Sequence, residues 1–161
     1  MTASPRPAFA RVLCPTDFSE FSTAALSYAA ALAASYGSAI RILHLLTPFP
    51  IVAPFGDVPG NGQLYESQRV QGRQALEAEA ARVRRPGLTV DVELRDGSAV
   101  HETLDAARDW GADLIVIGTH GRGGMERVVL GSVAEKVLRK ATCAVLAVPH
   151  AALAEAHATE R

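Results

Sequence analysis

Two kinds of segment alternate along this chain, and their order constrains the fold more than any other feature. Short apolar segments of strand composition are separated by longer segments in which apolar residues recur at helical spacing. The predicted strands are residues 11–14, 40–46, 88–94, 114–117 and 144–148, and the predicted helices are residues 19–36, 67–84, 98–110 and 132–140. Strict alternation of this kind is typical of a single doubly wound α/β domain with right-handed crossovers.

The pattern inside the strands predicts how the sheet is covered. Residues 114–117 and 144–148 are apolar without interruption, which is typical of parallel strands with helices on both faces. Residues 88–94 alternate between apolar and polar side chains, so we expect an edge strand with one face in contact with water. The result would be a five-stranded parallel sheet between two layers of helices.

The spacing of apolar side chains also predicts which face of each helix points inward. The expected inward residues are Phe21, Ala25, Tyr28, Leu32 and Tyr36 in the first helix, Val70, Leu76, Ala80 and Val83 in the second, Val100, Leu104 and Ala107 in the third, and Val133, Val137 and Leu138 in the fourth. Gly37 and Gly111 follow the first and third helices, as is common at helix C-termini.

The regions outside this pattern are predicted to be irregular. Residues 47–63 contain four prolines and three glycines and are too long for an ordinary connection between a strand and a helix, so we expect a variable loop that acts as a mobile flap or a partner contact. Residues 1–8 are expected to form a flexible N-terminus, residues 9–149 the domain, and residues 150–161 an Ala-rich tail.

Composition excludes several classes of protein. The 161 residues suit one domain, and a formal charge of −1 is unlike the basic surface of a general nucleic-acid binder. No run of 18 apolar residues is present, so we expect no membrane span, and the first ten residues lack the apolar core of a signal peptide. Cys14 and Cys143 have no zinc-site spacing, and we expect buried, reduced thiols and a cytoplasmic protein.

Ligands of doubly wound sheets bind beyond the carboxyl ends of the strands, so the residues that follow each strand are the first candidates for a site. Pro15, Thr16 and Asp17 follow the first strand. Asp17 has two interpretations that this segment alone leaves open. It is either an N-terminal helix cap or a carboxylate that accepts hydrogen bonds from a sugar diol.

After the fourth strand, four glycines occur within seven residues, and a Gly-Ser pair then opens the last helix. The four are Gly118, Gly121, Gly123 and Gly124. Glycine lets the backbone approach a ligand, and a helix N-terminus attracts anions, so this region is a candidate phosphate site. The alternative is a flexible loop capped by Ser132. Neither a Walker loop nor a GxGxxG sequence after the first strand is present.

The spacing of these residues resembles a known family. Gly118, Gly121, Gly131 and Ser132 reproduce the G-2x-G-9x-G-[ST] signature of ATP-binding universal stress proteins. The sequence PTDFS at 15–19, His44 near the end of the second strand, residues 111–118 and the closing residues 144–149 agree with the same family, so the likeness spans residues 9–149. It implies the adenine nucleotide alpha-hydrolase-like fold, with strand order 3-2-1-4-5.

The resemblance also implies a set of binding residues. Asp17 would bind the ribose hydroxyls, with Pro15 beside the nucleoside, and the backbone of Leu45 would contact the adenine edge. The base and ribose floor would comprise Ile117 and Gly118, and the phosphates would be held by Gly121, Gly131, Ser132 and Val133. Thr16 and His120 lie in the same segments and complete the candidate set. The implied ligands are ATP, with ADP or AMP as alternatives, and Mg²⁺.

Two features of the glycine-rich loop come from this sequence rather than from the family. Arg122 could pair with the outer phosphates, and its equal alternative is a solvated surface arginine. Gly123 and Gly124 make the loop looser than the signature requires. A further departure is Ser98, which stands where the family often has proline.

No catalytic group is evident in this set. His120 lacks an orienting carboxylate in the sequence around it, and no Ser-His-Asp or Cys-His arrangement is identifiable. We therefore expect a nucleotide-dependent stress-response regulator with slow hydrolysis or none. The first alternative is a chaperone-like or interaction module without nucleotide dependence. The second is an adenylate-transferring or flavin-related enzyme, which would need a catalytic group near the glycines.

The expected macromolecular partner is a second copy of the chain. Residues 143–148 form an apolar segment that ends the predicted sheet, and an exposed edge of that kind tends to pair with a copy of itself. The resemblance implies the same arrangement. We expect no nucleic-acid partner, no membrane partner and no metal site built from protein ligands alone.

Overall fold

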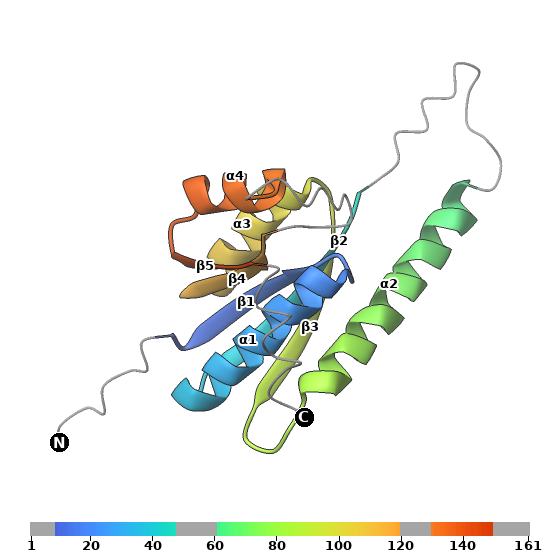
Figure 1. The fold of residues 1–161 in the computed structure, drawn as a ribbon. Coiled ribbons are helices and arrows are strands. Elements are labelled where there is room, and N and C mark those ends of the chain that lie inside the picture. Colours follow the sequence, from blue (N-terminus) through green and yellow to red (C-terminus); the bar gives the residue numbers. More distant parts are fainter. Residues whose placement is uncertain (1–8, 48–60, 120–129, 150–161) are drawn as a thin grey trace.

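Five parallel strands and four helices alternate in the computed structural model, which describes residues 9–47, 61–119 and 130–149 (Figure 1). The elements are β1 (Arg11–Thr16), α1 (Glu20–Tyr36), β2 (Ala39–Leu46), α2 (Asn61–Val83), β3 (Thr89–Asp96), α3 (Ala99–Trp110), β4 (Leu114–Gly118), α4 (Ser132–Lys140) and β5 (Ala144–Val148). The strand order is β3-β2-β1-β4-β5. This confirms the predicted doubly wound sheet, whose order reverses between β1 and β4.

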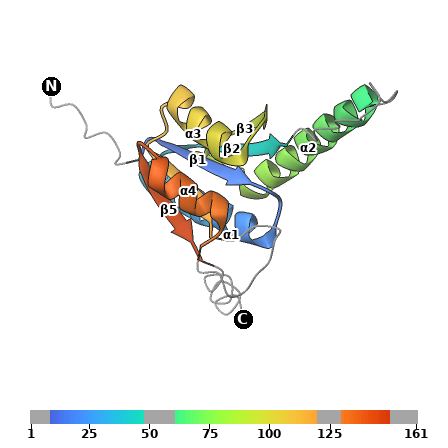
Figure 2. The ribbon, with the colours of Figure 1, turned by 90° about the horizontal axis from the view of Figure 1, so that it is seen from above.

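Helices cover both faces of the sheet. Alternate residues of the strands point to opposite faces, and two apolar clusters result. Val12 and Cys14 belong to the cluster on the α1 and α2 side, whereas Leu13 of the same strand belongs to the cluster on the α3 and α4 side. Figure 2 shows the sheet between these two layers. All of β4 is buried, as its continuous apolar sequence predicted.

Helix α1 packs through small residues, which corrects the predicted inward face. Ala25, Ala29 and Ala33 are completely buried, whereas Tyr28 is 42% exposed and Tyr36 is 45% exposed. The prediction holds for Ala25 and for Leu32, which packs against the core, and it was wrong for the two tyrosines. It weighted side-chain size, whereas the packing depends on how closely the helix backbone can approach the sheet. Tyr36 instead contacts Phe9 edge-to-face at its outer end.

Helix α2 begins earlier than predicted. It starts at Asn61 rather than Ser67, so the expected loop over residues 47–63 ends at least three residues sooner. Its first turns extend beyond the ends of β2 and β3 (Figure 1), and Val70 is 54% exposed rather than inside. Leu76 and Ala80 are buried as predicted, but Leu138 of α4 is half exposed, contrary to expectation. Residues 1–8, 48–60 and 150–161 lie outside the described part of the chain.

The two edge strands differ in their side chains. β3 is an edge strand with a polar face, as predicted. The expectation that helices cover both faces of residues 144–148 was wrong, because β5 is the other edge and Ala144 and Leu146 are exposed. Of the residues on that face, Val148 is buried.

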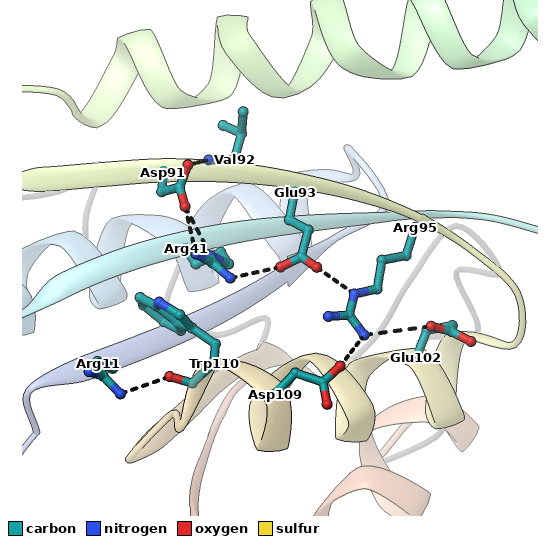
Figure 3. Close-up of polar contacts among 9 residues, drawn as sticks. All are labelled: Arg11, Arg41, Asp91, Val92, Glu93, Arg95, Glu102, Asp109 and Trp110. Carbon is teal, nitrogen blue, oxygen red and sulfur yellow. Dashed lines mark hydrogen bonds and ion pairs between the residues drawn. The ribbon is translucent and has the colours of Figure 1, made fainter.

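Charged side chains occupy the face of β3 that is directed toward α3 (Figure 3). The guanidinium of Arg41 on β2 lies 2.8 Å from Asp91 and 3.1 Å from Glu93, and 4.5 Å from the centre of the Trp110 ring. Arg95 bonds to Glu93 and lies 3.0 Å from Asp109. These contacts join the edge strand to α3 and satisfy its charges within the domain.

The described residues also bear on the cysteines and on membrane insertion. Cys14 is buried, which raises the pKa of its thiol well above the ordinary value, and Cys143 is only partly buried. Both cysteines are unpaired. Within the described ranges, no helix combines the length and the apolar character that spanning a bilayer requires.

Candidate functional site

The candidate residues gather where the strand order reverses. β1 and β4 are parallel neighbours, so their carboxyl ends meet at the same edge of the sheet. This edge carries Thr16 at the end of β1, Asp17 directly after it, and Gly118 at the end of β4. In open α/β sheets, ligands bind outside the carboxyl ends of the strands at such a reversal.

The turn after β1 is built around two short side chains. The Asp17 carboxylate accepts hydrogen bonds from the Ser19 backbone N–H at 3.1 Å and from the Ser19 hydroxyl at 2.6 Å. Ser19 is the N-cap of α1, and its hydroxyl oxygen accepts from the N–H of Ser22. The interpretation of Asp17 as the helix cap is therefore wrong. Ser19 caps the helix, and Asp17 holds Ser19 in place through the two hydrogen bonds.

Phe18, between these two residues, has a left-handed backbone conformation with φ of 62°. For a residue other than glycine this conformation costs about 1–2 kcal/mol and persists only where the surroundings impose it. Two contacts do so. The Phe18 N–H donates to the Thr16 hydroxyl oxygen at 3.0 Å, and the Phe18 ring lies against His44, with ring centres 4.2 Å apart.

His44 and Leu45 bring the end of β2 to the same edge. Nδ1 of His44 lies 2.8 Å from the carbonyl oxygen of Thr16 and must donate to it, because a carbonyl only accepts. Pairing between β1 and β2 ends at Thr16 and His44. Leu45 therefore lies one residue beyond the last pair, with its side chain packed on the α3 and α4 side.

The end of β4 contacts both neighbouring helices. A Cβ atom on Gly118 would lie 2.9 Å from the carbonyl oxygen of Phe21, so glycine lets the first turn of α1 approach the strand closely. Ile117 is buried on the opposite face. The next residue, Thr119, is also buried, and its carbonyl oxygen accepts from the N–H of Gly131 at 2.5 Å. This bond places the start of α4 beside the end of β4.

The N-terminus of α4 presents backbone N–H groups. Gly131 is its N-cap, and having no side chain it cannot cap the first turn. The helix begins its hydrogen bonding with Glu135 N–H to Gly131 C=O at 2.9 Å. The N–H groups of Ser132, Val133 and Ala134 consequently have no acceptor within the helix, and they carry the positive end of the helix dipole.

The structure thus brings most of the predicted residues to one edge of the sheet. They are Pro15, Thr16, Asp17, Leu45, Ile117, Gly118, Gly131, Ser132 and Val133. His120, Gly121 and Arg122 lie outside the described residues. Sequence reasoning missed the strained Phe18 and its contact with His44, since no local pattern marks a phenylalanine for a positive φ. It also missed Glu79, discussed below, although a charge between the core residues Leu76 and Ala80 was a readable signal.

The sequence pattern of the Universal stress protein family matches residues 8–149, which is most of the chain. The chain belongs to the universal stress protein family. Universal stress protein MJ0531 of Methanocaldococcus jannaschii is 32% identical over 143 residues, which cover 87% of this chain and 82% of that protein.

Solved structures share the fold of this universal stress protein. The structure of protein MJ0577 superposes with a TM-score of 0.78 at 26% identity, covering 89% of this chain and 97% of the other. A universal stress protein solved in complex with cAMP superposes with a TM-score of 0.66 at 25% identity, covering 88% and 97%. The strand order and the helices on both faces are therefore those of known family structures.

Proposed function

We propose that this universal stress protein binds an adenine nucleotide at the carboxyl edge between β1 and β4. The observation that carries the proposal is that the Asp17 turn and the N-terminus of α4 flank one short segment. Phe21 of α1 contacts Gly118, and Gly131 bonds to Thr119, so both turns are anchored to the end of β4.

The first half of this edge suits a sugar. The Asp17 carboxylate is fixed by two hydrogen bonds from Ser19, and a fixed carboxylate is a suitable acceptor for the two hydroxyls of a ribose. The side chain is only partly buried, so it is accessible to a ligand at the edge. The backbone of Leu45, beyond the last paired residue of β1, is in position to contact the base.

The second half suits phosphate. The N–H groups at the start of α4 lack intrahelical acceptors, and the helix dipole favours a negative charge there. The Ser132 hydroxyl is exposed at the same position. We propose ATP as the ligand, with its phosphates on Gly131, Ser132 and Val133, and with Gly121 and Arg122 completing the loop.

Magnesium would accompany the phosphates. Among the residues that the structure describes, no group of three or more His, Cys, Asp or Glu side chains is arranged to hold a metal ion. Mg²⁺ often keeps several waters and binds through phosphate oxygens with few protein ligands, so such a site would depend on the nucleotide.

We propose binding with slow hydrolysis or none, and regulation as the biological role. Among the residues that the structure describes, two titratable groups at this edge are both used structurally, since Asp17 accepts from Ser19 and His44 donates to Thr16. The complex of a family member with cAMP supports an adenine ligand. A bound nucleotide would change the surface at this edge of the sheet and so change which partner the protein accepts.

Titration calorimetry of the full chain with ATP, ADP, AMP and cAMP, each with and without Mg²⁺, tests the proposal. We expect a 1:1 complex that is tightest with Mg-ATP. Mass spectrometry of the nucleotide that co-purifies with the protein provides an independent check. If no adenine nucleotide binds, the site proposal fails and the alternative of an interaction module without nucleotide dependence stands.

We also propose a homodimer through residues 143–148. β5 is an edge strand, and Leu146 on it is 36% exposed. We expect Leu146→Asp to convert the dimer to monomer, because the charge would be buried between two copies. Val70→Asp, on the more exposed Val70 side chain of α2, is the control. Light scattering measures the mass, and a dimeric mass for Leu146→Asp would contradict the arrangement.

A further inference from the structure

Behind the candidate site lies a buried carboxylate that the proposed binding does not use. Glu79 on α2 is 7% exposed, and it is the one charged residue classed as buried among those that the structure describes. Its neighbours Leu76 and Ala80 belong to the apolar cluster between α2 and the sheet. Burying a carboxylate is unfavourable unless hydrogen bonds and an opposite charge offset the loss of water. An apolar side chain would fill this position without that cost.

The contacts of Glu79 lead to β1 and α1. Its Oε1 accepts a hydrogen bond from the Thr23 hydroxyl at 3.0 Å, and its Oε2 lies 3.5 Å from the Thr16 hydroxyl. Arg82, one turn further along α2, provides the opposite charge at 3.6 Å. The carboxylate therefore joins α2 to the last residue of β1 and to the first turns of α1.

From Thr16 the hydrogen bonds continue to Asp17. The Thr16 hydroxyl also lies 3.0 Å from Ser22 Oγ, and its oxygen accepts from the Phe18 N–H, which holds the left-handed conformation. Ser22 Oγ donates to the Ser19 carbonyl at 3.0 Å, and Ser19 Oγ donates to Asp17. A continuous set of polar contacts thus connects the buried carboxylate to the one at the edge.

Helix α2 reaches this turn at a second point. A Cβ on Gly72 would lie 3.4 Å from the His44 ring, so the helix passes directly over the histidine. The same ring packs on Phe18 and bonds to the Thr16 carbonyl. α1 and α2 lie on the same face of the sheet (Figure 1). Helix α2 therefore contacts both residues that hold Phe18 in place, Thr16 through Glu79 and His44 at Gly72.

We propose that Glu79 is a positioning residue for Asp17. Glu79 fixes the turn after β1 so that the Asp17 carboxylate can bind ribose hydroxyls. This inference rests on the proposed nucleotide binding. An ionised carboxylate only accepts hydrogen bonds, so Glu79 fixes the direction of the Thr23 hydroxyl proton. The single Thr16 hydroxyl proton is donated to Ser22 Oγ at 3.0 Å, and the negative charge of Glu79 Oε2, 3.5 Å away, favours this orientation, which leaves the Thr16 oxygen able to accept from Phe18. A glutamine has no charge and has an NH2 group in place of one carboxylate oxygen, so it would lose either the hydrogen bond from Thr23 or the attraction for the Thr16 proton.

The test compares the wild type with Glu79→Gln and with the control Glu77→Gln. Glu77 lies on the same helix, is exposed and pairs with Arg84 at 3.0 Å, so the control removes an equal charge without touching the turn. Two quantities are measured in each protein. One is the hydrogen-exchange rate of the Phe18 and Ser19 amides without ligand, and the other is the affinity for ATP, 2′-deoxy-ATP and 3′-deoxy-ATP.

In Glu79→Gln we expect faster hydrogen exchange at both amides. The preference is the ratio of the affinity for ATP to the affinity for the deoxy analogue that the wild type binds more weakly, and we expect this ratio to fall roughly 3- to 10-fold. In Glu77→Gln we expect no change. A loss that is equal for ATP and for both deoxy analogues would show a structural role only, and unchanged exchange would overturn the positioning role without reference to any ligand. A third outcome is that the wild type binds no nucleotide but the exchange rates still rise in Glu79→Gln. The proposed nucleotide binding would then fail, and the proposal that Glu79 supports the turn would stand.

A second variant protects the test against a folding defect. Thr23→Val removes the 3.0 Å donor to Glu79 and leaves the charge in place. We expect the same two effects, reduced in size, at temperatures where both proteins are folded. Glu79→Gln could prove too unstable to measure. In that case, exchange rates and a nucleotide preference in Thr23→Val that equal those of the wild type would overturn the proposal.

Discussion

The two turns that form the candidate site are built in opposite ways. The turn from Thr16 to Ser19 is held by side chains, since the hydroxyls of Thr16 and Ser19 and the carboxylate of Asp17 all take part in its hydrogen bonds. At the start of α4, in the described part of the chain, the anchoring hydrogen bond joins two backbone groups, Gly131 N–H and Thr119 C=O. The first turn also contains a strained residue, whereas Gly131 has an ordinary extended conformation with φ of −68°.

This difference suggests that the first turn recognises the sugar and that the start of α4 binds the phosphates. A sugar is recognised by a fixed acceptor, which requires a side chain held in place, while a phosphate accepts hydrogen bonds from N–H groups and needs open space around them. Adenosine has the sugar and lacks the phosphates. Comparing its affinity with that of ATP therefore separates the two turns in the binding variants below.

The largest effect is expected for Gly131→Val. Its backbone conformation is one that any residue adopts, so the change places a branched side chain in the phosphate path without straining the chain. We expect ATP affinity to fall roughly 100-fold or more, with adenosine affinity nearly unchanged. Titration calorimetry measures both. Ser98→Val places the same side chain at the N-cap of α3 and serves as the control. An equal loss of affinity for ATP and for adenosine would contradict separate roles for the two turns.

Asp17→Ala comes next. Loss of a charge-assisted hydrogen bond costs about 1.5–3 kcal/mol, so we expect roughly 10- to 150-fold weaker binding of ATP and of adenosine alike. Asp113→Ala is a matched control, because Asp113 accepts two backbone hydrogen bonds at 2.9 Å at the amino end of the sheet. Calorimetric affinities equal to those of the wild type would rule out a ribose contact.

Gly118→Ala tests how closely α1 packs against the end of β4. The added Cβ would meet the Phe21 carbonyl oxygen at 2.9 Å, and the backbone of α1 would have to move. We expect the free energy of unfolding to fall by about 1–3 kcal/mol in chemical denaturation. Gly62→Ala, where a Cβ meets no atom within 4 Å, is expected to leave stability unchanged or slightly higher. The same small effect for both variants would contradict the close approach.

Ser132→Ala is expected to have the smallest effect. The remaining backbone N–H groups still bind phosphate, so the loss of one neutral hydroxyl should weaken ATP binding by roughly 2- to 10-fold, corresponding to about 0.5–1.5 kcal/mol. Adenosine affinity, measured in the same titrations, should not change. A loss as large as that of Gly131→Val would mean that the hydroxyl, rather than the backbone, holds the phosphate.

The alternation of segments was sufficient to predict the element order, the parallel sheet and the location of the candidate site. These follow from local patterns, because a strand covered on both faces must be continuously apolar and a site at a sheet reversal must lie after particular strands. Predictions failed where packing distance decided the outcome. The inward face of α1 is its alanine face because close approach to β4 excludes the tyrosines, and this requires knowledge of the neighbouring strand.

The sequence by itself determined which residues follow the strands of this protein and therefore which side chains reach the carboxyl edge of the sheet. Only the tertiary structure decided how those side chains are held. Glu79 lies 62 positions after Asp17 in the chain, and Phe18 has its strained conformation because Thr16 and His44 impose it. Contacts between distant segments leave no local pattern, since each partner alone is an ordinary helix or strand residue.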